Sequence, residues 1–341
     1  MRILLGMSGG LDSTYAAKLL LAAGHTVEGA VLIMHDHTEL SAARESAISL
    51  GIKLHEIDCR EIFRRTVMAD FTSEYLSART PNPCVICNSE VKFKCLYDFA
   101  MENGFDRIAT GHYAKIALCD GRYSVARSAD SKKDQTYMLW RLPQSILSAL
   151  VFPLGELTKE EVRKEAKSES LVAADREESQ EICFIPSGDY AAFIEAENGP
   201  CPEGDFVDCD GKILGKHGGI IRYTVGQRKG LGIALGARAF VTDIDPVSNR
   251  ITLSYEAKQT ESLRISSLVF SGISPLSEGD EITLDVKVRY LAPPVRARVR
   301  IESGDTATVT LDTPAKSVTP GQSAVFYIGD RVAFGGIIYS N

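Results

Sequence analysis

Two cysteines three residues apart, at the start of a helix-like segment, are the residues best suited to do chemistry. Residues 80–88 read TPNPCVICN, so Cys84 and Cys87 follow directly after Asn82 and Pro83. Asn82 suits the N-cap of a helix and Pro83 suits its first turn. A thiol near the positive end of a helix has a lowered pKa. Since lysine also follows at Lys92, the segment predicts reactive thiolates.

A third cysteine, Cys183, lies far along the chain, in a short apolar run after an acidic stretch. On its own it is interpreted as a buried structural cysteine, because free cysteine is among the most buried residue types. The Cys84 and Cys87 pair on its own indicates half of a zinc site or a redox pair. The remaining cysteines are isolated, which disfavours zinc. The pair does not follow the first strand, which disfavours a thioredoxin-like fold.

A second chemical feature is the string GMSGGLDS at residues 6–13, between an apolar strand and a helix. Such a turn directs free backbone N–H groups and a positive helix end at one point. Two glycines let the backbone approach a phosphate, and serine hydroxyls add donors. The string is neither a Walker A motif nor a GxGxxG fingerprint. A nucleotide-binding loop is favoured over an ordinary capped strand–helix turn, and Asp12 is a candidate Mg²⁺ ligand.

The elements that carry these residues alternate between strand and helix. Strands are predicted at residues 2–7, 26–34, 52–57 and 107–110, and helices at 12–23, 39–50 and 88–101. This alternation predicts right-handed crossovers and a parallel, Rossmann-like sheet. The fold class is therefore α/β.

The pattern changes near residue 200, where glycine becomes frequent. Strands are predicted at residues 239–243, 250–253, 282–290, 295–301, 306–311 and 323–328, with turn signals between them. Short strands at regular spacing predict a small β-barrel or sandwich. The predicted domains are therefore a catalytic domain at 1–200, a small central domain at 201–262 and a C-terminal β-barrel at 263–341.

Composition excludes several classes of protein. The chain has 341 residues, 44% of them hydrophobic and 24% charged, with a net charge of −7, which is typical of a soluble globular protein of about two or three domains. No apolar run approaches the roughly 20 residues that span a bilayer, and the N-terminal apolar run is too short for a signal peptide. We therefore expect a cytoplasmic protein. The eight cysteines are then not a disulfide framework.

The loop at residues 6–13 resembles the pyrophosphate-binding (PP) loop of the N-type ATP pyrophosphatases, which activate a carbonyl oxygen with AMP. With the cysteine motifs added, the chain resembles the tRNA-specific 2-thiouridylases (the MnmA/TrmU family) of that superfamily. The matching segments occur in family order: GMSGGLDS at 6–13, TPNPCVICN at 80–88, ATGHYA at 109–114, KDQTYMLW at 133–140, ESQEICFI at 178–185, YTVGQRKGLGI at 223–233 and TPGQSAVFYIGD at 319–330.

The resemblance implies roles for individual residues. It makes Cys87 and Cys183 the catalytic thiols. The residues expected to bind ATP are Gly6, Met7, Ser8, Gly9, Gly10, Leu11, Asp12, Ser13, Met34 and Gly111. The residues expected to line the flipped base or contact tRNA are Asn82, Pro83, Cys84, Lys133, Asp134, Gln135, Arg289 and Tyr290.

The implied reaction replaces the C2 oxygen of the wobble uridine of a tRNA anticodon with sulfur. ATP adenylates the oxygen, a persulfide on Cys183 supplies sulfur, and AMP and pyrophosphate leave. Cys87 either attacks the activated base first or receives the disulfide, so a Cys87–Cys183 disulfide is expected as a resting or product state. The persulfide must come from a partner, a cysteine desulfurase or a sulfur-relay protein.

Two departures from the family are visible. Residues 35–58 form a shorter segment than expected, and Cys84 stands where many members carry aspartate. The extra thiol opens a different sulfur chemistry, in which Cys84, Cys87 and Cys183 ligate a [4Fe–4S] cluster. Two other classes of protein also stay open at this point: a small-molecule amide ligase and a non-catalytic tRNA-binding protein.

A basic stretch favours RNA binding independently of the motifs. Residues 287–300 hold five basic residues and no acidic one. Arg296, Arg298 and Arg300 alternate, so they would share one face of a strand. That face either binds phosphates or is simply solvated.

Overall fold

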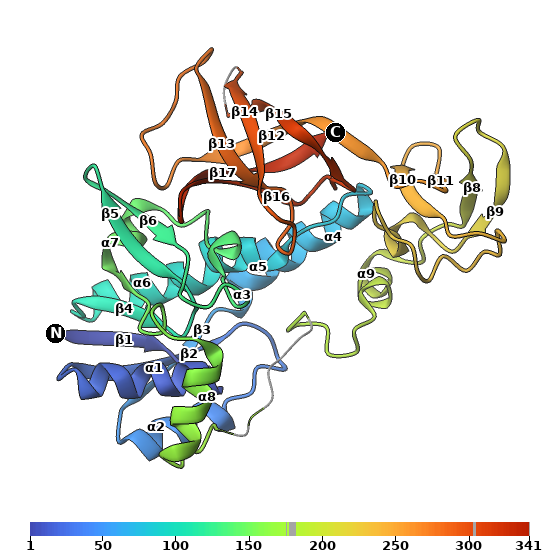
Figure 1. The fold of residues 1–341 in the computed structure, drawn as a ribbon. Coiled ribbons are helices and arrows are strands. Elements are labelled where there is room, and N and C mark those ends of the chain that lie inside the picture. The colour runs from blue at the N-terminus through green and yellow to red at the C-terminus, as the bar shows by residue number, and fades with distance from the viewer. Residues whose placement is uncertain (175, 177–181, 303–304, 341) are drawn as a thin grey trace.

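The computed structural model describes residues 1–174, 176, 182–302 and 305–340. Three bodies are visible in Figure 1: an α/β domain that contains the N-terminus, a small β-rich domain formed by β8–β11, and a barrel that contains the C-terminus. In the described part of the chain, no helix is long and apolar enough to cross a membrane.

The first domain is built on a five-stranded parallel sheet with the order β3-β2-β1-β4-β7. Its strands are β1 (Arg2–Gly6), β2 (Thr26–Ile33), β3 (Leu54–Asp58), β4 (Arg107–Thr110) and β7 (Leu150–Val151). The centre of β1 is buried on both faces, as expected for a parallel strand covered by helices on both sides. The parallel sheet predicted from the sequence is confirmed, with strand ends shifted by one or two residues.

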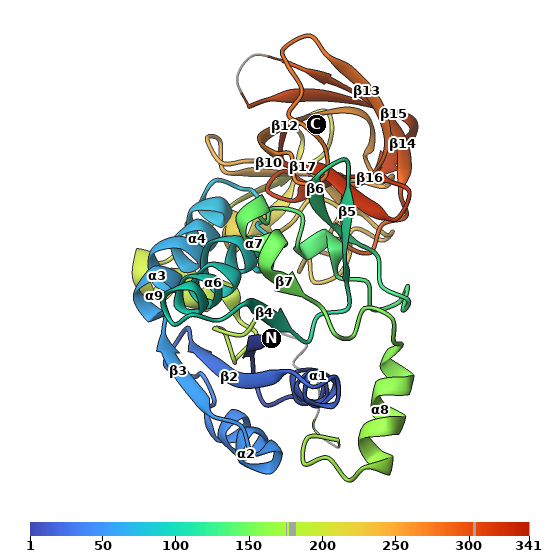
Figure 2. The same ribbon diagram turned by 90° about the vertical axis from the view of Figure 1, so that its left-hand side faces the viewer.

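Helices cover both faces of this sheet (Figures 1 and 2). One face carries α1 (Leu11–Ala22), α2 (Ser41–Leu50) and α8 (Lys159–Ser168). The other carries α3 (Arg60–Phe63), α4 (Ala69–Leu76), α5 (Pro83–Ile86) and α6 (Phe93–Glu102), with the π-helical turns η1 (Arg64–Met68) and η2 (Cys87–Lys92) inserted. Gly51 ends α2 in the left-handed conformation, and a Thr158–Glu161 capping box starts α8.

Between β4 and α8 the chain makes a hairpin that reaches the barrel. It consists of β5 (Lys115–Cys119) and β6 (Arg122–Ala126), followed by η3 (Thr136–Met138) and α7 (Gln144–Ala149). Ala126 of β6 pairs with Arg331 of the last strand, so the first domain and the barrel share an eight-stranded sheet. The sequence pattern did not predict this hairpin.

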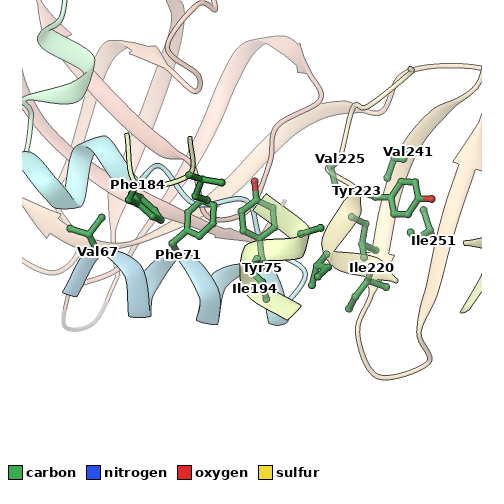
Figure 3. Packing of buried hydrophobic residues seen from close by; sticks show 14 of the residues in the cluster. Val67, Phe71, Tyr75, Phe184, Ile194, Ile220, Tyr223, Val225, Val241 and Ile251 are labelled. Atoms are coloured by element: carbon green, nitrogen blue, oxygen red, sulfur yellow. The ribbon is translucent and has the colours of Figure 1, made fainter. Parts of the chain in front are cut away.

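The central domain is a four-stranded sheet with the order β10-β11-β8-β9. Its elements are α9 (Tyr190–Asn198), β8 (Gly204–Val207), β9 (Ile213–His217), η4 (Ile220–Arg222), β10 (Phe240–Asp245) and β11 (Arg250–Ser254). Its core continues without a break into the core beside α4. Phe71 and Phe184 belong to the same hydrophobic cluster as Tyr223 and Val241 (Figure 3).

Six antiparallel strands close the C-terminal barrel, with the order β12-β15-β14-β13-β16-β17 and a final β12–β17 pairing. They are β12 (Gln259–Val269), β13 (Glu281–Lys287), β14 (Val295–Ile301), β15 (Ala307–Lys316), β16 (Ser323–Ile328) and β17 (Arg331–Ser340). The prediction of a small barrel is confirmed, although β12 and β17 were not predicted. Closure removes the exposed strand edges that an open sheet would leave.

Candidate functional site

The candidate nucleotide loop lies at the carboxyl end of β1, the edge where parallel α/β sheets bind ligands. Gly9 has φ +79°, and a Cβ on it would lie 2.2 Å from the Ala42 carbonyl carbon. A Cβ on Gly111, after β4, would lie 2.7 Å from the Asp12 carbonyl carbon. Protein backbone, from α2 and from the start of α1, therefore already demands glycine at both positions. Met7 and Leu11 turn into the core beside β1.

The serines of the loop bond to the loop itself. Ser13 Oγ donates to the Gly10 carbonyl oxygen at 3.1 Å and lies 3.3 Å from Ser8 Oγ. Gly10 is the N-cap of α1 and makes no side-chain cap. The exposed Ser8 and the N-terminal backbone of α1 are therefore the groups that an incoming phosphate would meet.

Asp12 is already paired. Lys159 Nζ lies 2.7 and 2.8 Å from the two Asp12 carboxylate oxygens, and the Tyr113 hydroxyl donates to Oδ1 at 2.9 Å. Lys159 is only 8% exposed, so this is a shielded ion pair. Asp12 was predicted as a candidate Mg²⁺ ligand, but its oxygens do not fit that role while Lys159 occupies them. Sequence reasoning missed Lys159, whose only signal is the capping box at the start of α8.

Arg176 forms hydrogen bonds with both the nucleotide loop and α2. Its guanidinium donates to the Gly9 carbonyl oxygen, to the Ala42 carbonyl oxygen at 3.0 Å and to Ser46 Oγ at 3.2 Å. It also pairs with Glu45 of α2. The two carbonyl oxygens that the guanidinium bridges belong to the loop and to α2, so Arg176 fixes their spacing. The sequence carried no signal for this residue.

The predicted thiols meet at the same end of the sheet. Cys87 Sγ lies 3.7 Å from the Sδ of Met34, the first residue after β2. Cys84 and Cys183 are close enough to Cys87 that a negative charge on either raises its pKa, and Cys84 acts likewise on Cys183. All three are free thiols, so the expected Cys87–Cys183 disulfide is not formed in this structure.

The expected lowering of the thiol pKa is wrong for Cys87. Burial raises the pKa of Cys87 to about 11, and the opposing charge of Lys92 is too weak to offset it. The Cys183 residue is exposed, but nearby protein removes water from its thiol, and this desolvation raises its pKa as well. The one-turn helix α5 does not compensate for the removal of water. Asn82 is the N-cap residue of α5, as predicted, but it makes no side-chain cap and donates to Met138 Sδ at 3.4 Å instead.

Cys183 is held in place by its neighbour Phe184. The Phe184 ring is buried and lies 5.4 Å from the rings of Phe63 and Phe71 and 5.5 Å from that of Phe193. Figure 3 shows Phe184 directed at Phe71 and Val67. Phe184 takes the buried structural position, and Cys183 is left exposed, so the buried interpretation of Cys183 is wrong. Residues 178–181 of the ESQEICFI motif lie outside the described residues.

The central domain and the barrel both form hydrogen bonds with the segment before Cys84. Thr80 N–H donates to the Pro320 carbonyl oxygen at 2.8 Å, and Gln322 Nε2 donates to the Thr80 carbonyl oxygen at 2.9 Å and to that of Pro81 at 3.2 Å. From the central domain, Thr224 Oγ1 lies 3.1 Å from Thr80 Oγ1. Three motifs that are distant in sequence, at residues 80–88, 223–233 and 319–330, therefore meet at Thr80.

The residues predicted to contact tRNA have protein partners. Arg289 donates to the Val225 carbonyl oxygen at 2.8 Å and to Thr319 Oγ1, and burial lowers its pKa. Arg289 thus joins the central domain to the barrel. The Tyr290 ring lies 6.0 Å from that of Tyr137.

Residues 133–135, also predicted to contact tRNA, form hydrogen bonds within the protein as well. Asp134 is buried and accepts from Thr136 N–H at 3.2 Å and from its hydroxyl at 2.9 Å. Gln135 Oε1 accepts from Tyr113 N–H at 2.8 Å. The Lys133 N–H donates to Asp130 Oδ1 at 3.2 Å. These contacts tie the loop before η3 to the end of β4.

The alternating arginines of β14 share an exposed face, as predicted. Arg296, Arg298 and Arg300 are exposed, and the residues between them are buried. On the neighbouring strand, Asp285 pairs in register with Arg296 and Glu281 with Arg300. The acidic partners reduce the net positive charge of this face.

Metal ligation by the thiols is not favoured. In residues 1–174, 176, 182–302 and 305–340, no group of three or more His, Cys, Asp or Glu side chains is arranged to hold a metal ion. Cys84, Cys87 and Cys183 all lie within those residues, so the three-thiolate ligand set of a [4Fe–4S] cluster is not assembled.

Comparison with known proteins gives a consistent family. Residues 1–187 match the family described as tRNA methyl transferase HUP domain, residues 191–255 the tRNA methyl transferase PRC-barrel domain, and residues 260–338 the aminomethyltransferase beta-barrel domain. The tRNA-specific 2-thiouridylase MnmA of Carboxydothermus hydrogenoformans is 42% identical over 357 residues, covering 99% of this chain and 97% of that protein.

A second relative and a solved structure extend the comparison. The tRNA-specific 2-thiouridylase MnmA of Acetivibrio thermocellus is 43% identical over 356 residues, covering 99% of both chains. A crystal structure of a 4-thiouridine synthetase–RNA complex with bound ATP is 16% identical and covers 57% of this chain and 50% of that chain, with a TM-score of 0.38.

Proposed function

Because the chain belongs to the tRNA-specific 2-thiouridylase family of the PP-loop superfamily, we propose that it replaces the C2 oxygen of an anticodon wobble uridine with sulfur. The observation that carries this proposal is that Cys87, which contacts Met34, is close enough to Cys183 for the charge of one thiol to act on the other, at the sheet edge that also bears the candidate nucleotide loop. A ligase acting on a small molecule would need neither thiol.

The chemistry begins with activation of the base. A ring carbonyl oxygen is a poor leaving group, so the C2 oxygen attacks the α-phosphorus of ATP and pyrophosphate leaves. The loop at 6–13, with Met34 and Gly111, is proposed to hold ATP for this step by positioning and electrostatic stabilisation. We propose that Mg²⁺ accompanies ATP, but we assign it no ligand because Lys159 occupies Asp12.

Sulfur transfer follows at the thiols. The terminal sulfur of a Cys183 persulfide attacks C2, and AMP leaves with the former C2 oxygen. Cys87 then attacks Cys183 Sγ and breaks the persulfide bond, so sulfur stays on C2 and a Cys87–Cys183 disulfide forms. In the alternative order, Cys87 attacks the adenylated base first. Cys87 is buried, and Cys183 is exposed, which suits Cys183 as the thiol that an external persulfide donor loads.

The remaining residues are proposed to present the tRNA. A wobble uridine lies in a single-stranded loop and can be splayed into a pocket. We propose that Asn82, Pro83 and Cys84 line that pocket, and that Lys133, Asp134, Gln135, Arg289 and Tyr290 belong to the tRNA-binding stretches. In this proposal residues 1–200 perform the chemistry in the cytoplasm, and domains 201–262 and 263–341 hold the RNA.

The test is a reconstituted reaction with a wobble-uridine tRNA, ATP and a cysteine desulfurase with cysteine as sulfur source. Digestion and mass spectrometry of the nucleosides should detect 2-thiouridine, with one AMP released per sulfur. Cys87→Ser and Cys183→Ser should abolish it, and Cys209→Ser, at an exposed cysteine of the central domain, should not. Full thiolation by Cys183→Ser would refute the proposal.

A further inference from the structure

Two cysteines that the proposed reaction does not use lie in contact beside the catalytic thiols. Cys59 follows β3 as the N-cap residue of α3, and Cys95 lies in the first turn of α6. Both cysteines belong to or pack against one hydrophobic cluster, and their thiols are close enough that each shifts the pKa of the other. Cys59 is 2% exposed, and Cys95 is half-buried against the same hydrophobic cluster. Two thiols in contact can close into a disulfide by exchange, which a single buried cysteine cannot do.

The helix that carries Cys87 also carries Cys95. Helices α5, η2 and α6 follow one another without a break, and residues four apart share a face of a helix. Cys87, Val91 and Cys95 have this spacing. Cys87 and Val91 are buried in the cluster that contains Cys59, and Cys95 packs against that cluster. The three side chains therefore point toward the same core.

Cys59 is also placed near Met34 and Cys87. Its N–H donates to the Ile33 carbonyl oxygen at 2.8 Å, so it is adjacent to Met34, whose sulfur is 3.7 Å from Cys87 Sγ. Cys87 is also close enough that its charge acts on Cys59. Cys59 thus neighbours the catalytic thiol on one side and Cys95 on the other.

The contact polarises the pair. The hydrogen bond from the Cys59 thiol lowers the pKa of Cys95, and the same contact together with burial raises the pKa of Cys59. Cys95 is consequently the better thiolate and the more exposed of the two. These are the properties of the outer member of an exchange pair, which a dithiol reductant in solution can reach.

We propose that Cys59 and Cys95 form a resolving dithiol that takes up the Cys87–Cys183 disulfide left by each sulfur transfer. This inference rests on the proposed function. Cys59 transfers its proton to the Cys95 thiolate and attacks Cys87 Sγ, and Cys183 leaves as a thiolate. Cys95 then attacks Cys59 Sγ, and Cys87 leaves as a thiol.

The exchange balances without an added oxidant. One disulfide, one thiol and one thiolate become one disulfide, one thiol and one thiolate, with two electrons moved from the Cys59–Cys95 pair to the catalytic pair. An external dithiol reductant closes the cycle by reducing Cys59–Cys95. The relay leaves Cys183 reduced, so the next persulfide can be loaded before that reduction.

The decisive experiment is one turnover of the fully reduced wild-type chain, loaded with persulfide, without reductant. Acid quenching, alkylation and peptide mapping by mass spectrometry then identify the disulfide. A Cys59–Cys95 linkage with alkylated Cys87 and Cys183 supports the relay. A Cys87–Cys183 linkage with alkylated Cys59 and Cys95 overturns the relay and leaves the proposed function intact. If 2-thiouridine forms with no disulfide at all, both the relay and the proposed sulfur step are wrong.

Steady-state kinetics provide an independent readout. Cys95→Ser should keep the single-turnover rate and lower multiple turnover roughly tenfold when the dithiol reductant is limiting. Saturating reductant should restore it, which loss of folding would not allow. Cys119→Ser, at a half-buried cysteine of the β5–β6 hairpin, is the matched control and should behave as wild type. Equal multiple turnover of both variants at limiting reductant would overturn the relay.

Discussion

In the proposed function, residues 80–88 form the catalytic segment, and Gly321 of the barrel lies against its first residue, Thr80. The substitution Gly321→Ala tests that contact. Gly321 has φ +91°, and a Cβ on it would lie 2.7 to 2.9 Å from the carbonyl oxygen, carbonyl carbon and nitrogen of Thr80. Backbone atoms cannot rotate away as a side-chain end can. The substitution should therefore displace Thr80, and with it the chain that leads directly to Cys84 and Cys87.

The size of the effect follows from two contributions. A non-glycine residue in the left-handed conformation costs about 1–2 kcal/mol. Displacing Thr80 loses its N–H bond to Pro320, at 2.8 Å, and the bond from Gln322 to its carbonyl oxygen, at 2.9 Å. Each is worth about 1 kcal/mol. We expect Gly321→Ala to lower the free energy of unfolding by about 3–4 kcal/mol, the sum of these contributions, and to reduce thiolation more than ATP binding.

Gly279→Ala is the matched control, because Gly279 has φ +86° and nothing within 4 Å of an added Cβ. It should lose only the conformational contribution of about 1–2 kcal/mol and retain activity. Urea unfolding can be followed by the fluorescence of Trp140, the only tryptophan, whose indole N–H donates to Ser323 Oγ of the barrel at 3.0 Å. If both variants lose equal stability and equal activity, the contact with Thr80 does not support the catalytic segment.

Two further predictions concern charge. Lys159→Met should raise the KM for ATP at least about tenfold, because losing charged hydrogen bonds worth roughly 1.5–3 kcal/mol leaves the Asp12 carboxylate without its cation, where it repels the phosphates of ATP. Lys164→Met, at an exposed position of the same helix, should not change the KM, and equal KM values for the two variants would refute a role for Lys159. Burial raises the pKa of Cys87 to about 11, so a rate that depends on its thiolate should rise about tenfold per pH unit from pH 7 to 9. Cys87 should not change the free energy of unfolding in that window. A raised pKa in the folded state lowers this free energy only as the pH rises above the pKa of the unfolded thiol, near 9, toward about 11. A rate that levels off near pH 8.5 would contradict the raised pKa of Cys87.

Local signals were sufficient to predict the parallel sheet and to identify residues 6–13 as a candidate nucleotide loop. The apolar run of β1, the glycines after it and the helical spacing of α1 lie within about twenty residues, so each supports the others without tertiary information. The barrel was also predictable as a class, because short strands with turn signals repeat. Strand β12 was missed because its exposed positions carry polar residues and no turn signal marks its start.

The chemistry of the site depended on contacts that no local pattern encodes. The start of α8 is predictable from its capping box, but that Lys159 reaches Asp12 is not. The prediction of a lowered pKa for Cys87 failed for the same reason. A helix terminus is visible in sequence, whereas the packing that removes water from the thiol comes from segments far along the chain, including the one that carries Phe184.

The nucleotide half and the sulfur half of the site differ in how many domains they need. Residues 6–13 are positioned by β1, α1 and α2, all within the first domain. Thr80, in contrast, bonds to Pro320 and Gln322 of the barrel and to Thr224 of the central domain. The first domain alone would lose these bonds, each worth about 1 kcal/mol. Under the proposed function, the loop that holds ATP is thus positioned within one domain, whereas the segment that carries Cys84 and Cys87 is positioned by all three. RNA bound to the two outer domains would act on the same contacts.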